Sequence, residues 1–66
     1  MTTATANQLR ARLAQKSDAE LDCIERSALY ALESVSANEM SHPAARQQIA
    51  IRDACRAEFD RRYDRA

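Results

Sequence analysis

Residues 17–38, SDAELDCIERSALYALESVSAN, decide the fold, because this segment is apolar on two sides. It begins with a capping box, S-x-x-E, in which Ser17 and Glu20 each bond the other's backbone amide. One apolar line recurs at helical spacing: Leu21, Ile24, Ala28, Ala31, Leu32 and Val35. The opposite line is small except for a tyrosine: Ala19, Cys23, Ser27, Tyr30 and Ala37. A helix with two such faces needs neighbours on both, so we expect residues 18–37 to form the central helix.

A second long helix is predicted after the break at Ser41-His42-Pro43. Proline disfavours helix at the preceding residue and is tolerated as a first helical residue, so Ser41 or His42 should cap a helix over residues 43–64. Its apolar stripe follows four-residue steps: Ile51, Cys55, Phe59 and Tyr63. We expect this stripe to pack against the apolar line that starts at Leu21.

Shorter patterns complete the layout. Leu9 and Leu13 predict a short first helix over residues 6–15, while residues 1–5 are expected to be frayed. A second S-x-x-E pattern at 36–39 offers an alternative in which a short helical turn begins there. With no glycine and one proline, the composition favours helix throughout. The prediction for residues 1–66 is a single all-α domain, a small three-helix bundle.

The charge is zero overall but unevenly distributed. Residues 1–16 carry +3, residues 17–40 carry −5 and residues 41–66 carry +2. One interpretation is that an acidic central helix packs between basic ones. The other is an acidic docking surface for a basic partner. Because a 66-residue chain with few large apolar side chains has little core, a protein partner or a homodimer is expected.

The predicted partner surface combines two groups of residues. Small residues allow a second helix to approach closely, and tyrosine is enriched among the residues that dominate interfaces. We therefore predict that Cys23, Ser27 and Tyr30 contact a partner. Either the first helix covers this face through its leucines, or a partner does. Arg52 and Arg56 lie within the apolar arc of the last helix. They either reach acids of the central helix, such as Asp22, Glu25 and Glu33, or border a groove for an acidic partner.

A nucleic-acid interface is the alternative for the last helix. It would use the arginines Arg46, Arg52, Arg56, Arg61 and Arg62. Arginines near a helix C-terminus also complement the helix dipole, which explains the cluster at the chain end without any ligand. A pI near 6.5 is not typical of a nucleic-acid-binding domain.

Other classes of function lack their signals. The soft metal ligands, Cys23, His42 and Cys55, do not have paired short spacings, and the chain has no glycine for a phosphate loop. We therefore expect no catalytic residue, metal, cofactor or small-molecule substrate. The polar start MTTATANQLR and the absence of a long apolar run predict neither a signal peptide nor a membrane span. Two unpatterned cysteines suit a reducing cytoplasm, so we expect a cytoplasmic protein with free thiols.

Several local patterns resemble the Hha/YmoA family of small helical modulators, which associate with nucleoid proteins. These patterns are LRARL at 9–13, the stretch 17–26 with L-x-x-I-E-R, VSANEM at 35–40, and DACRAEF at 53–59 followed by Tyr63-Asp64. The spacings between them differ from the family's, and the family's C-terminal segment with proline and tryptophan is absent. The resemblance implies a co-regulator of transcription that binds a protein partner in a bacterial cytoplasm.

The expected function is therefore a non-enzymatic helical interaction module, and the resemblance implies that it modulates bacterial gene regulation through a protein partner. One alternative is a dimeric nucleic-acid-binding protein that uses arginines of the last helix. The other is a small phage- or plasmid-type inhibitor that docks on a large host machine.

Overall fold

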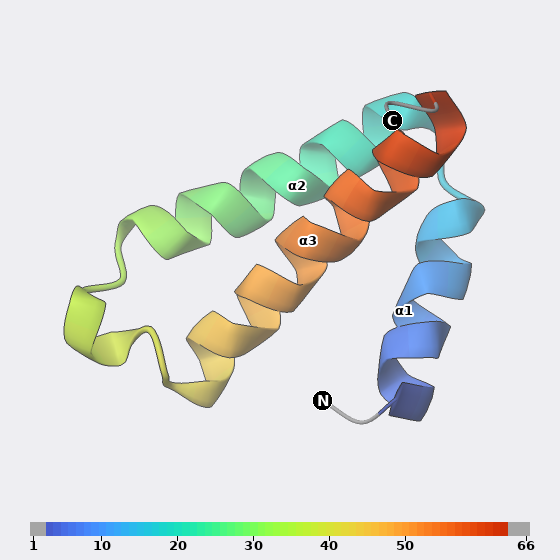
Figure 1. Cartoon of the computed structure of the whole chain (residues 1–66). Coiled ribbons are helices and arrows are strands. Elements are labelled where there is room, and N and C mark those ends of the chain that lie inside the picture. Colours follow the sequence, from blue (N-terminus) through green and yellow to red (C-terminus); the bar gives the residue numbers. More distant parts are fainter. Residues whose placement is uncertain (1–2, 64–66) are drawn as a thin grey trace.

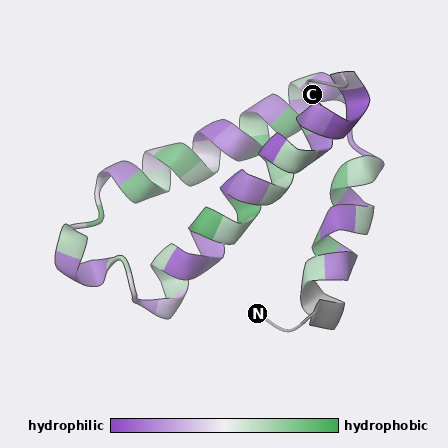
Figure 2. Ribbon diagram, in the orientation of Figure 1, coloured by the Kyte–Doolittle hydropathy of each residue, from purple (hydrophilic) through white to green (hydrophobic). Residues whose placement is uncertain are grey.

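The computed structural model describes residues 3–63, and the side chains from Ala6 onward. It consists of helices and their connections, without a strand in the described chain, which confirms the all-α prediction. The elements shown in Figure 1 are α1 (Thr3–Ala14), α2 (Asp18–Glu33), the 3-10 turn η1 (Ala37–Glu39) and α3 (Pro43–Tyr63). Apolar and polar residues alternate along each helix in Figure 2, and no described helix has the length and apolar character needed to cross a membrane.

The end of α2 differs from the predicted end of the central helix. We expected helix through position 37, but α2 ends at Glu33 and is followed by the cap residue Ser34. The Ser34 hydroxyl donates to the carbonyl of Ala31 at 3.0 Å, and such a local bond competes with helix continuation. The alternative, a short turn starting after Ser36, is confirmed by η1, although the Ser36 side chain makes no capping bond.

The other boundaries agree more closely with expectation. The first helix begins at Thr3 instead of Ala6, so three of the five residues expected to be frayed are helical; Met1 and Thr2 lie outside the described residues. The last helix begins at Pro43 as predicted and is described to Tyr63, while position 64 lies outside the description. Nδ1 of His42 accepts a bond from the backbone of the second helical residue at 3.4 Å.

The helix with two neighbours is α3 and not α2. In Figure 1, α2 and α3 run antiparallel and diverge towards η1, and α1 lies beside α3. The prediction that α2 is the central helix is therefore wrong. The face of α2 that carries Cys23, Ser27 and Tyr30 is not covered by α1 and is exposed.

One contiguous cluster in the core joins the three helices through Leu13, Leu21 and Cys55. Ala28 of α2 and Ala45 of α3 are buried as well. Partly buried apolar residues surround the cluster, namely Leu9, Ile24, Ile51, Ala54 and Phe59. This arrangement confirms the expected pairing of the α2 and α3 stripes, except at Tyr63. That side chain is 53% exposed, and its ring stacks on Phe59 with the centroids 6.4 Å apart.

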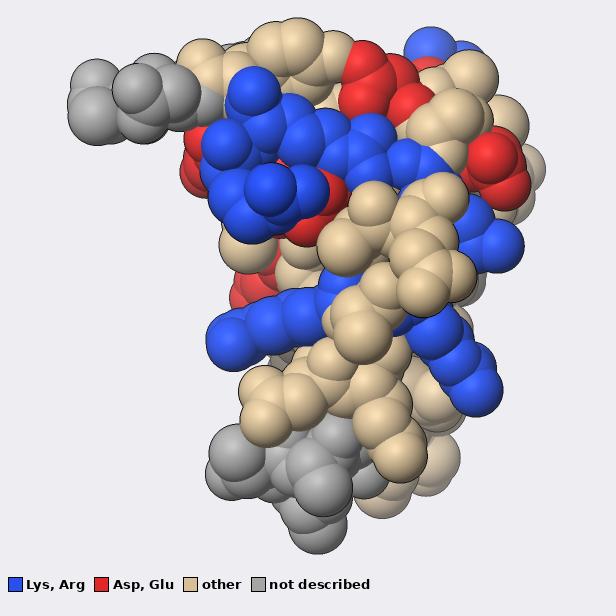
Figure 3. All heavy atoms as spheres, turned by 90° about the vertical axis from the view of Figure 1, so that its right-hand side faces the viewer, with Lys and Arg blue, Asp and Glu red and all other residues tan. Residues whose placement is uncertain are grey.

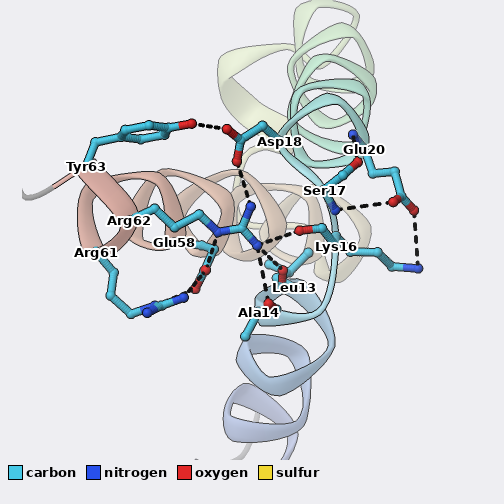
Figure 4. Close-up of polar contacts among 10 residues, drawn as sticks. All are labelled: Leu13, Ala14, Lys16, Ser17, Asp18, Glu20, Glu58, Arg61, Arg62 and Tyr63. Carbon is cyan, nitrogen blue, oxygen red and sulfur yellow. Dashed lines mark hydrogen bonds and ion pairs between the residues drawn. The ribbon is translucent and has the colours of Figure 1, made fainter.

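Arg62 joins all three helices at one end of the molecule, as Figure 4 shows. Its Nη2 donates to three carbonyls at and just beyond the end of α1: Leu13 at 3.2 Å, Ala14 at 3.3 Å and Lys16 at 2.5 Å. Its Nη1 donates to Asp18 at the start of α2 at 2.7 Å, and its Nε donates to Glu58 of α3 at 2.6 Å. The last carbonyls of a helix have no intrahelical donor, so this guanidinium supplies one and complements the negative end of the α1 dipole.

Glu58 is the buried acid of this cluster, 8% exposed. It also accepts two bonds from Arg61, from Nε at 3.0 Å and from Nη2 at 2.5 Å. These hydrogen bonds from Arg61, followed by those from Arg62, lower the pKa of Glu58 to about 2. The ion pair between Glu58 and Arg62 is therefore partly buried, with the two side chains 8% and 18% exposed. Every buried side-chain nitrogen or oxygen in the described chain has a hydrogen-bond partner.

Replacing Arg62 should detach the end of α1. We expect Arg62→Gln to lower the melting temperature and to speed amide exchange in α1, because three carbonyls lose their donor. Arg61→Gln is the matched control, since it removes the same charge and also contacts Glu58 but makes no bond to α1. Thermal unfolding followed by circular dichroism, together with hydrogen exchange, measures both effects. Equal effects of the two variants would contradict this role of Arg62.

The depressed pKa of Glu58 predicts an acid-labile part of the stability. Its ordinary pKa is 4.5 and its folded pKa is about 2, so ionised Glu58 stabilises the folded state above pH 4.5. This contribution should be lost progressively as the pH falls from 4.5 towards 2. Urea unfolding of the wild type and of Glu58→Gln across this range isolates the effect by difference. If the free energy of unfolding falls equally in both proteins, Glu58 is not the source of the acid-labile stability.

Candidate protein-interaction surface

The outward face of α2 is open in this fold. We call Ala19, Cys23, Ser27 and Tyr30 the α2 outer surface; all four are exposed. Tyr30 is 78% exposed, more than either of the other exposed large apolar residues of the described chain. The alternative in which the first helix covers this face is wrong, because Leu9 and Leu13 pack on the core around Cys55 instead.

The capping box at the start of α2 helps to fix which residues face outward. The Glu20 amide donates to Oγ of Ser17 at 3.2 Å, and the Ser17 amide donates to Oε1 of Glu20 at 3.2 Å. These bonds, the backbone one first, hold the pKa of Glu20 below its ordinary value. Once the helix starts at Asp18, Leu21 and Ala28 are buried towards α3, and the residues half a turn away point to solvent.

A groove runs along one edge of this surface. A hollow of about 440 Å³ is lined by Lys16, Ala19, Glu20, Cys23 and Ile24. A second hollow of about 250 Å³ is lined by Cys23, Ile24, Ser27, Ala28, Gln48 and Ile51. Because the two hollows share Cys23 and Ile24, we treat them as one feature, the α2 groove. Its walls are mostly apolar, and α3 contributes one side of it.

Arg52 and Arg56 do not join this surface. Arg56 lines a different hollow of about 420 Å³, with Asp22, Glu25, Phe59 and Asp60, which has no residue in common with the α2 groove. Arg52 donates to its neighbour Asp53 at 3.0 Å instead of reaching an acid of α2. Within residues 3–63, no ion pair links either arginine to α2. Of the five predicted partner-binding residues, Cys23 and Ser27 therefore line the α2 groove, whereas Arg56 lines a separate hollow.

The predicted nucleic-acid set is also dispersed. Arg46 lies in the first turn of α3 and Arg61 in the last, which separates them by about 22 Å along the helix axis at 1.5 Å per residue. Arg62 is fully engaged between the helices, and Arg52 pairs with Asp53. These arginines do not form a common surface on α3.

Sequence reasoning did not identify three residues that line the groove: Gln48 and Ile51 of α3, and Ile24 of α2. Gln48 lay outside the predicted stripe, and Ile24 and Ile51 were both assigned to the core. In the structure these two isoleucines are only partly buried and line the groove. The helical period marks the apolar side of a helix, but it does not show how far a neighbouring helix covers that side.

Comparisons of the chain with protein-family models, with curated proteins and with solved structures found no match. The resemblance to the Hha/YmoA family therefore remains a hypothesis. The interpretation of the α2 outer surface depends on its own residues.

The two cysteines should differ strongly in reactivity. Cys23 is exposed on the α2 outer surface, whereas Cys55 is buried in the core. Burial, with a smaller effect of the Glu25 charge, raises the pKa of the Cys55 thiol and so lowers its thiolate fraction. Ellman's reagent should titrate one thiol quickly in the folded protein and the second only on unfolding, with Cys23→Ser abolishing the fast phase. Two rapidly reacting thiols in the folded wild type would contradict the burial of Cys55 in the core.

Proposed function

We propose that this chain is a non-enzymatic helical interaction module that acts by binding another protein through the α2 outer surface and the α2 groove. The observation that carries the proposal is the exposure of Tyr30, 78%, about one helical turn after Ser27, which lines an open apolar groove. Tyrosine is enriched among the residues that dominate protein interfaces, because it supplies a large contact area and a polar tip.

The shape of this surface suits a helical partner. Ala19, Cys23 and Ser27 are small and lie on one side of a regular 16-residue helix, so a second helix can approach closely. Ile24 and Ile51 supply apolar contacts within the groove. A partner helix would bury this area and leave Tyr30 packed at its edge.

Charge defines the partner further. Lys16 precedes the α2 outer surface, and Glu33 ends the helix on the far side of Tyr30. The partner should therefore be an amphipathic helix with a small or apolar face, an acid near Lys16 and a base near Glu33. In a homodimer with two antiparallel α2 helices, Glu33 of one copy would lie near Lys16 of the other, which meets the charge requirement in part. The test must therefore distinguish self-association from binding of another protein.

Two further considerations support a role in binding rather than catalysis. The strongly shifted acid, Glu58, is engaged by Arg61 and Arg62, and it anchors the arginine that links the three helices. The resemblance to the Hha/YmoA family supplies a setting for the proposal: modulation of transcription through a protein partner in a bacterial cytoplasm.

Tyr30→Ala should leave the fold intact and abolish association. Because the side chain is largely solvated, we expect its loss to change the free energy of unfolding by no more than about 0.5 kcal/mol. Met40→Ala is the matched control, since it truncates another exposed large apolar residue away from the α2 outer surface. Thermal unfolding measures stability, and sedimentation velocity measures self-association of the purified chain. Co-purification from native cells with mass spectrometry identifies any other partner.

The proposal requires that the same identified partner, or the same dimer, is retained by Met40→Ala and lost by Tyr30→Ala. Equal retention by both variants would refute the α2 outer surface as the binding site. A large drop in melting temperature for Tyr30→Ala would show that the tyrosine is covered within the fold.

A further inference from the structure

A basic face lies on the side of the molecule formed by α1 and the end of α3. Figure 3 views this side with α1 in front: Lys and Arg side chains extend to both sides in its lower half, and a larger basic group lies in its upper half next to acidic side chains. We call Arg10, Arg12 and Arg61 the basic face. It is distinct from the α2 outer surface, which belongs to another helix.

The arginines of α1 are not neutralised by their own helix. Its sequence, TATANQLRARLA, contains no acidic residue, and both Arg10 and Arg12 are exposed. Within the described chain, neither of them forms an ion pair. Two residues apart on a helix, they project on opposite sides of the leucine line that packs on the core. They therefore border the outward face of α1 on both sides.

Arg61 adds a third cation at a fixed place. Its neighbour Arg62 bonds the carbonyls at the end of α1, which holds the end of α3 against that helix. Arg61 itself is 64% exposed, and one edge of its guanidinium is bound to Glu58. The remaining donors of this guanidinium are available to a ligand, in a group whose position is already set.

From Ala6 onward, where the side chains are described, the outward face of α1 and the residue that follows it carry only amide and alanine side chains: Asn7, Gln8, Ala11, Ala14 and Gln15, all exposed. No large apolar or aromatic side chain is present there. A membrane-bound helix inserts such side chains into the bilayer, and a protein interface normally buries them at its centre. Phosphate contacts need neither, because cations and amide donors suffice.

We propose that the basic face binds the phosphate backbone of nucleic acid without reading its sequence. Arg10 and Arg12 contact phosphates from the two sides of α1, and Arg61 contacts a further one near the end of α3. This site replaces the dispersed arginine set that the sequence suggested on α3. It does not depend on the proposed function of the α2 outer surface, which remains free.

The test measures binding of the full-length protein to a fluorescent 20-base-pair DNA duplex of arbitrary sequence by anisotropy, across a salt series. Three phosphate contacts predict a slope of log K against log salt of about −3. Arg10→Gln/Arg12→Gln should reduce the magnitude of that slope by about 2, and Arg61→Gln by about 1. The matched control, Arg46→Gln/Arg56→Gln, removes two exposed arginines elsewhere and should leave the slope unchanged.

Thermal unfolding of each variant establishes that it is folded at the temperature of the titration. If the α1 double variant does not fold, Arg61→Gln and the charge-preserving Arg10→Lys/Arg12→Lys decide the question, since the latter should keep the slope of the wild type. Absence of salt-dependent binding by the wild type at about 50 mM salt would overturn the proposal. So would an equal loss in the control variant. Tighter binding to phosphatidylserine vesicles or to polyglutamate than to the duplex would assign the face to a membrane or an acidic protein instead.

Discussion

The guanidinium of Arg62 is the contact on which the arrangement of the helices depends. It closes the carbonyl end of α1, pairs with Asp18 at the start of α2 and is anchored by Glu58 in its own helix. Among the described side chains of the first helix, only Leu9 and Leu13 join the core cluster, which is little apolar area. With its end tied to α3, this helix lies on the α3 side, and the outward face of α2 stays open.

Because α1 lies on the α3 side, its basic surface is separate from the apolar surface of α2, although the net charge of the chain is zero. The charge of Glu58 is compensated by ion pairs with Arg61 and Arg62 of its own helix. The arginines of α1 then face solvent without acids in their own helix. On the other side of the α2–α3 pair, Asp22 and Glu25 lie around a hollow with Arg56. The two proposed sites follow from this separation: an apolar one along α2 and a basic one along α1.

Much of the fold was predictable from local signals. A capping box and a proline mark the starts of α2 and α3, and four-residue steps identify the stripes that pack together. The stop at Glu33 was not predictable, because it coincides with a serine hydroxyl bond that helix propensity does not reveal. The same uncertainty at helix ends explains why the first helix begins earlier than expected.

The candidate site was predictable only in part. Cys23, Ser27 and Tyr30 were identified correctly as one face of α2, but small residues suit burial and exposure equally well, so the sequence could not say whether α1 covers them. Arg52 and Arg56 were predicted to join this surface, but Arg56 lines a separate hollow, and the arginine that links the helices is Arg62. The long-range contacts of Arg62 reach residues more than 40 positions away, and no local period encodes them.

The position of α1 is the point that a single measurement tests most directly. Nuclear Overhauser effects in solution report which side chains lie close together. We predict effects from the Leu13 methyl groups to Leu21 and to the Cys55 β-protons, because these three residues form the core. We predict none from either leucine of α1 to the Tyr30 ring. Effects between that ring and Leu9 or Leu13 would place α1 over α2 and contradict the open surface.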